Sequence, residues 1–132
     1  MKLIVCLDNR NGMAFHNRRQ SSDLMVTNKI LQLTQGHRLW MNSYSGYLFA
    51  DRCENIHIDA DFLHNAGQED FCFAEISDVR TVLSNVRQLY VFRWNRTYPG
   101  DLYFPKIPGK SQILAEFAGN SHEKITLEVY RL

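Results

Sequence analysis

Short apolar segments typical of β-strands alternate with segments of helical spacing through the first 85 residues, and this alternation limits the folds open to the chain. Strands are expected at residues 2–7, 38–41, 56–58, 71–74, 88–94, 112–117 and 124–130. Helices are expected at residues 23–35, 43–50, 61–66 and 77–83. Alternating strands and helices favour a parallel sheet, and strands in succession favour antiparallel pairing. The pattern therefore predicts an α/β fold with a mixed, mostly parallel sheet, a C-terminal antiparallel hairpin and helices on both faces.

The size and charge of the chain narrow its possible partners. It has 132 residues, of which 45% are hydrophobic and 22% charged, which is typical of one globular domain spanning residues 1–132. A net charge of +1 provides no general attraction to nucleic acid or anionic lipid. No apolar run approaches the roughly 20 residues of a membrane span. We therefore expect neither a nucleic-acid partner nor a membrane partner.

The cysteines indicate a reducing compartment. Cys6, Cys53 and Cys72 are odd in number and widely spaced, which does not fit a disulfide framework. Cys6 and Cys72 fall on strands expected in the interior, where a thiol is an inert, small apolar group. The sequence thus predicts a cytoplasmic protein with free thiols.

Asp23 is the first candidate site residue, at the start of the helix expected over 23–35. Ser21 and Ser22 offer an N-cap, and an acid at this position complements the positive end of the helix. If burial raises its pKa, the Asp23 carboxyl could instead hold a protonated ring nitrogen or relay a proton in an apolar cleft. Both interpretations remain open from the residues alone.

Two further groups of residues could bind phosphate. Ser43, Tyr44 and Ser45 begin a helix, where backbone N–H groups and hydroxyls either hold an anion or serve as an ordinary cap. Arg18 and Arg19 follow His16 in a segment, 16–20, that we expect to be an exposed loop. Paired arginines suit bidentate contacts to phosphate, although a solvated loop has the same composition.

Other groups of residues give weaker evidence for a functional site. His57, Asp59 and Asp61 alternate like ligands on one strand face, but no second cluster completes a set of four, so no metal site is predicted. Arg93 and Trp94 could stack on a base or simply belong to a strand face. The chain has neither a phosphate-cradling glycine loop nor a nucleophile elbow, so kinase-like and serine-hydrolase functions lack motif support.

Several stretches together resemble dihydrofolate reductase and cover most of the chain. They are residues 3–8 with 11–13, 22–24, 39–45, and, in the C-terminal part, 89–90, 100–101, 104–105, 116–117 and 128–130. The resemblance implies a reductase-like fold. It also implies that Asp23 stands where the family contacts the pterin, and that the turn at Ser43 to Ser45 stands where the family holds cofactor phosphate.

The chain departs from that family where the nicotinamide cofactor binds. Ala74 and Glu75 stand in place of the family's glycine pair, so a side chain blocks the close approach of a diphosphate and a carboxylate repels it. Ser43 replaces the basic residue that meets the cofactor's 2′-phosphate, and Phe92 replaces a supporting threonine. The middle of the chain, residues 50–70, is shorter than the family's adenosine-binding part. We therefore expect no cofactor.

The first functional hypothesis is a non-catalytic protein that binds, and thereby sequesters, a nucleotide or a phosphate-bearing metabolite derived from one. The cleft of this hypothesis contains Val5, Cys6, Arg18, Arg19, Asp23, Leu24, Ser43, Tyr44, Ser45 and Phe92. One alternative is a reductase acting on a dihydropterin with a differently held cofactor. Another is an interaction module that forms a homo-oligomer.

Overall fold

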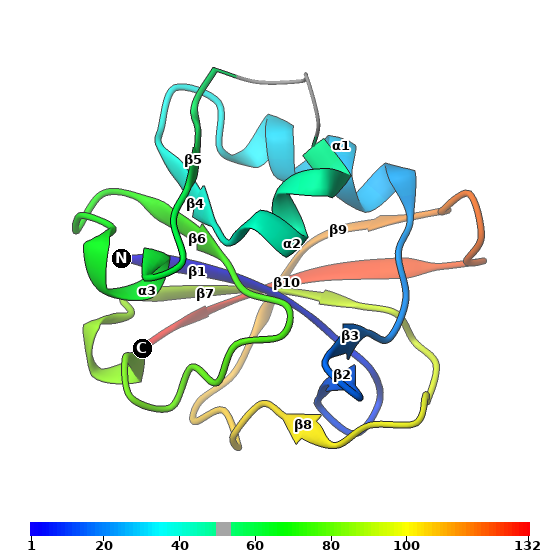
Figure 1. Cartoon of the computed structure of the whole chain (residues 1–132). Helices are drawn as coiled ribbons and strands as arrows, with labels where there is room; N and C mark the ends of the chain where they lie inside the picture. The colour runs from blue at the N-terminus through cyan, green and yellow to red at the C-terminus, as the bar shows by residue number, and fades with distance from the viewer. Residues whose placement is uncertain (50–53) are drawn as a thin grey trace.

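A seven-stranded mixed sheet forms the centre of the computed structural model, which describes residues 1–49 and 54–132 (Figure 1). Its strands are β1 (Lys2–Leu7), β4 (Leu39–Met41), β5 (Ile56–Ile58), β6 (Phe71–Phe73), β7 (Gln88–Arg93), β9 (Gln112–Phe117) and β10 (Ile125–Arg131). The spatial order is β5-β4-β6-β1-β7-β10-β9. The pairs among β5, β4, β6, β1 and β7 are parallel, whereas β10 runs antiparallel to both β7 and β9. The predicted α/β fold and its C-terminal antiparallel hairpin are confirmed.

A second, small antiparallel sheet has the order β3-β2-β8 and consists of β2 (Gly12–Phe15), β3 (Arg18–Arg19) and β8 (Leu102–Tyr103). The prediction of a loop over 16–20 was therefore wrong in part, because Arg18 and Arg19 pair with β2. His16 and Asn17 form the turn with φ values of 51° and 61°. A two-residue hairpin turn requires positive φ at both positions, and Asn and His tolerate it better than most residues.

The helices begin at polar caps close to the expected positions. Helix α1 covers Leu24–Leu33, and its N-cap is Asp23 rather than either preceding serine. Helix α2 (Ser43–Gly46) continues into the 3₁₀ helix η1 (Tyr47–Phe49), and the side chain of its N-cap, Asn42, accepts the N–H of Ser45 at 3.0 Å. Helix α3 covers Phe62–Asn65. The expected end of the second helix at residue 50, and Cys53, lie outside the described residues.

The helix predicted over 77–83 does not form. That segment consists of bends and turns and leads into the 3₁₀ helix η2 (Leu83–Asn85). The carboxylate of Asp78 accepts the backbone N–H of Arg80 at 3.0 Å, a local turn that competes with helix formation. The β-branched residues that follow, Val79 and Val82, weaken helix propensity further and are buried in the core.

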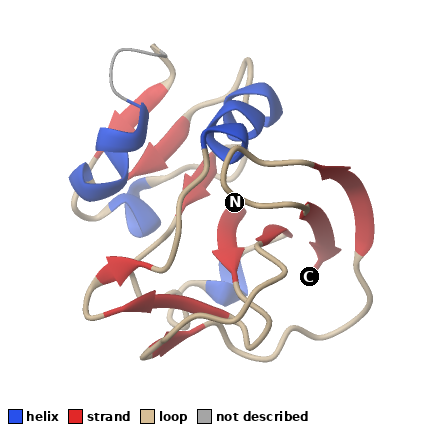
Figure 2. Ribbon diagram, turned by 90° about the vertical axis from the view of Figure 1, so that its right-hand side faces the viewer, coloured by secondary structure: helices blue, strands red, loops and turns tan. Residues whose placement is uncertain are grey.

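Alternate residues of β1 face two separate apolar cores. Leu3, Val5 and Leu7 belong to one core with α3, while Ile4 belongs to the other with α1. Figure 1 shows α1 and α2 above the sheet and α3 near the N-terminus, and Figure 2 shows how much of the chain outside the strands is loop. Among the described residues, no helix has the length and apolarity needed to cross a bilayer.

Candidate functional site

A cavity of ≈ 180 Å³ opens beside the N-terminus of α1. Leu24, Leu48, Phe73 and Trp94 contribute apolar surface to its lining. The polar residues Ser21, Ser22, Asp23 and Glu75, and Cys6, also line it. The neighbouring parallel strands β6, β1 and β7 deliver several of these residues because their carboxyl ends meet at one edge of the sheet, where ligands of α/β proteins bind. Since an engineered cavity of about 150 Å³ accommodates benzene, this one has room for a compact ring.

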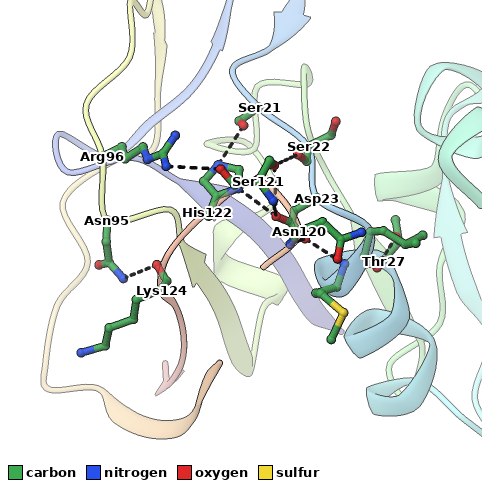
Figure 3. Close-up of polar contacts among 12 residues, drawn as sticks. Ser21, Ser22, Asp23, Thr27, Asn95, Arg96, Asn120, Ser121, His122 and Lys124 are labelled. Carbon is green, nitrogen blue, oxygen red and sulfur yellow. Dashed lines mark hydrogen bonds and ion pairs between the residues drawn. The ribbon is translucent and has the colours of Figure 1, made fainter. Parts of the chain in front are cut away.

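Asp23 is a buried hub rather than a free carboxylate (Figure 3). Its Oδ1 accepts the backbone N–H groups of Met25 and Asn120, both at 2.9 Å. Its Oδ2 accepts the N–H of Ser121 at 2.9 Å and the hydroxyl of Ser121 at 3.1 Å. Nδ1 of His122 lies 2.9 Å from the same oxygen. The carboxylate therefore joins the start of α1 to the loop between β9 and β10.

These contacts decide the charge of Asp23. Burial alone would raise its pKa, but hydrogen bonds from the N–H groups of Ser121 and Asn120 and from the His122 ring outweigh burial and hold the pKa well below its usual range. The condition for a proton-relaying Asp23, a pKa raised by burial, is therefore not met. Asp23 stays ionised, and its hydrogen-bonding capacity is used within the protein.

His122 is a buried member of the site that the sequence interpretation did not include. Its side chain is 2% exposed, and its ring stacks on Trp94 with centroids 4.5 Å apart. Nε2 lies 3.0 Å from Oγ of Ser21 and 3.1 Å from the hydroxyl of Tyr98. No local sequence pattern predicts that His122 belongs to the site. It follows Asp23 by 99 positions and contacts it only in the folded structure.

Glu75 organises the second polar group at the cavity. Both of its carboxylate oxygens accept from the guanidinium of Arg19, at 2.8 and 2.9 Å, and Oγ of Ser45 donates to Oε1 at 2.8 Å. The guanidinium also lies over the ring of Tyr44, 4.2 Å from its centroid. Burial lowers the pKa of Arg19, but the hydrogen bonds and charge of Glu75 more than compensate and raise it. Two of the predicted site residues, Arg19 and Ser45, thus bind the protein's own carboxylate, and a third, Tyr44, packs against Arg19.

The remaining predicted site residues lie apart from this group or outside the cavity lining. Val5 is fully buried in the core that contains α3, and Phe92 is fully buried in the core that contains α1. Arg18 is exposed on the β2–β3 hairpin, and Ser43 is exposed at the start of α2. Trp94, two residues beyond Phe92, lines the cavity instead.

The thiol of Cys6 is held in its protonated form. Burial raises its pKa well above the usual range, and the negative charge of Glu75 raises it further. Within residues 1–49 and 54–132, no three His, Cys, Asp or Glu side chains are grouped so as to hold a metal ion. His57 stacks on Trp40, with ring centroids 4.9 Å apart.

The sequence matches no protein-family model, and no curated protein matches it. The resemblance to dihydrofolate reductase therefore depends only on the short stretches described above.

Proposed function

We propose that the protein binds a small molecule built on one compact planar ring, of the kind found in nucleobases and their metabolites. The observation that carries this proposal is the ≈ 180 Å³ cavity, whose lining combines the apolar residues Leu24, Leu48, Phe73 and Trp94 with the polar residues Ser21 and Glu75. A cavity with mostly apolar walls and a few convergent polar groups is the usual form of a small-molecule site.

The charges around the cavity favour a neutral or protonated ring over an anionic group. The acidic residues of its lining are Asp23, whose carboxylate is fully buried, and Glu75. The nearby Arg19 is already paired with both oxygens of Glu75. A ligand phosphate would need to displace Glu75, whereas a ring with N–H groups finds an acceptor in the same carboxylate. We therefore propose the ring, and not the phosphate, as the part of the ligand that enters the cavity.

The dihydropterin reductase is the weaker alternative. Asp23 already accepts from Met25, Asn120, Ser121 and His122, so a pterin would have to replace one of these contacts. Glu75 also occupies the side on which the family resemblance would place a diphosphate.

A thermal-shift panel tests the binding proposal. Nucleobases, nucleosides, mononucleotides and a pterin are added separately to the purified chain, and a ligand at 100 times its dissociation constant should add about 2.7 kcal/mol of stability. The variant Leu48→Phe narrows the cavity and should abolish the shift, whereas Leu114→Phe, on the exposed strand β9, should retain it. The proposal fails if no compound shifts the parent protein, or if Leu48→Phe responds as the parent does.

A further inference from the structure

Ser21, His122 and Asp23 form a hydrogen-bonded series at the edge of the cavity (Figure 3). Oγ of Ser21 lies 3.0 Å from Nε2 of His122, and Nδ1 of the same ring lies 2.9 Å from Oδ2 of Asp23. A hydroxyl, an imidazole and a buried carboxylate in this order are recognised by their geometry, whatever their order along the chain. We infer that Ser21 is a nucleophile, activated by His122 and Asp23, that takes the acyl group of a small ester bound in the cavity.

The surroundings of Asp23 suit the role of the buried carboxylate that orients the histidine. Its carboxylate is fully buried and is kept ionised by its backbone donors. A carboxylate at Nδ1 favours the tautomer in which Nδ1 carries the proton, so that Nε2 presents its lone pair to Ser21. The stack on Trp94 holds the plane of the ring.

Of the three residues Ser21, His122 and Asp23, a ligand can reach only the Ser21 hydroxyl. Ser21 is partly exposed and lines the cavity together with Leu24 and Trp94, whereas the His122 side chain is 2% exposed. A ligand in the cavity therefore meets Oγ of Ser21 and not the imidazole. The Tyr98 hydroxyl, 3.1 Å from Nε2, shares the nitrogen with Ser21 and can accept from Nε2–H once the ring is protonated.

The chemistry balances with water as the only co-reactant. Oγ of Ser21 bonds to the ester carbonyl carbon while its proton passes to Nε2 of His122. The bond from that carbon to the leaving oxygen then breaks, and the proton on Nε2 passes to the departing alcohol. Water attacks the resulting acyl-serine, its proton returns through Nε2 to Ser21, and the acid leaves.

The carbonyl oxygen also needs a hydrogen-bond donor, and Leu24, the first residue of α1, lines the cavity. The first four N–H groups of a helix lack ordinary intrahelical acceptors. Those of Met25, Val26 and Thr27 donate to Asp23. We assign the carbonyl oxygen to the N–H of Leu24, the remaining member of this turn, whose side chain lines the cavity.

Covalent labelling tests this inference, which goes beyond binding but rests on the proposed cavity being open to ligands. The full chain is incubated with a small sulfonyl fluoride, which loses fluoride when a serine oxygen attacks the sulfur, and the adduct is mapped by peptide mass spectrometry. One adduct on Ser21 is expected. Ser21→Ala should abolish it, whereas the control Ser84→Ala, at an exposed serine of η2 that does not line this cavity, should retain it.

A second variant tests whether Ser21 is labelled because His122 activates it or only because it is accessible to the reagent. His122→Gln keeps a side-chain donor toward Asp23 but cannot act as a base at Ser21, and we expect the labelling rate to fall about 10²-fold or more. Unchanged labelling in folded His122→Gln, labelling of another serine, or no adduct would overturn the inference. If the parent still binds a ring compound in the thermal-shift panel, this inference alone has failed. If it binds none, the proposed function has failed as well.

Discussion

The guanidinium of Arg19 holds both carboxylate oxygens of Glu75, at 2.8 and 2.9 Å. This pair joins β3 of the small sheet to the segment that follows β6, and Oγ of Ser45 ties α2 to the same carboxylate. Bidentate arginine contacts of this kind are those that proteins use to hold phosphate. The Glu75 carboxylate therefore occupies the place that a bound anion would take, because Arg19 and Ser45 supply the donors of an anion site.

Removing that carboxylate should create an anion site. Glu75→Ala leaves the Arg19 guanidinium and the Ser45 hydroxyl without their shared acceptor, so the variant should be less stable than the parent by about 1–3 kcal/mol. Sulfate at ten times its dissociation constant should then restore about 1.4 kcal/mol, measured by thermal unfolding at constant ionic strength. Glu69→Ala, which removes an exposed acid 3.8 Å from Arg87, serves as the control and should show no such rescue. Equal responses of the two variants to sulfate would count against an anion site at Arg19.

Asp23 should make the stability of the fold sensitive to acid. Its pKa is well below the usual value in the folded protein, so the unfolded chain binds more protons as the pH falls. The contribution of Asp23 is thus complete above its unfolded pKa of about 3.9 and is lost as the pH falls toward the folded value. Urea unfolding should show Asp23→Asn to be less stable than the parent by about 2–4 kcal/mol at pH 7, and this difference should narrow below about pH 4. A difference that stays constant from pH 7 to pH 2 would contradict the assignment.

Gly119 should not tolerate a side chain. A Cβ at this position would overlap the Asp23 carboxylate and lie 2.9 Å from Cδ1 of Ile125. Overpacking in a tight interior costs about 1–3 kcal/mol, and we expect Gly119→Ala to lower the unfolding free energy by that amount. Glu123→Ala, at an exposed position of the same loop, is the control and should change stability by less than about 0.5 kcal/mol.

Two thiols should resist alkylation in the native protein. Burial raises the pKa of Cys72 to about 12, and the pKa of Cys6 is also well above normal, so little thiolate is present at pH 8. Iodoacetamide followed by peptide mass spectrometry should leave both cysteines unmodified in the folded chain and modify both in urea. Rapid modification of Cys6 without urea would show that the cavity lowers its pKa rather than raising it.

Strands were predictable from the sequence where local composition and tertiary packing agree. The apolar run 2–7 forms β1, which is buried between two neighbours, and strand β7 closely follows its prediction. The helix predicted over 77–83 was wrong because Ser77 indicated a cap, whereas the side chain of Asp78 forms a local turn with the backbone N–H of Arg80. The turn at His16 and Asn17 was missed because it lacks the Asn-Gly or Asp-Gly signal of such hairpins.

The candidate site was predictable only in parts. Glu75 could be singled out through the family resemblance, as a carboxylate in place of a glycine, but its pairing with Arg19 joins residues 56 positions apart, which no local pattern encodes. His122 follows an exposed loop residue and looks in the sequence like any polar surface position. Its burial against Trp94 depends on the β9–β10 loop folding back over the start of α1.

The cap of α1 also sets an order of events for the growing polypeptide. Asn120 and Ser121 donate to the Asp23 carboxylate across 97 and 98 residues of chain, so these contacts cannot form before Ser121 has left the ribosome. Contacts of such large sequence separation slow folding because a long loop must close first. During synthesis, the contacts that join Asp23 to the loop between β9 and β10 therefore form only after that loop has been made, whereas its bond to the N–H of Met25 is local.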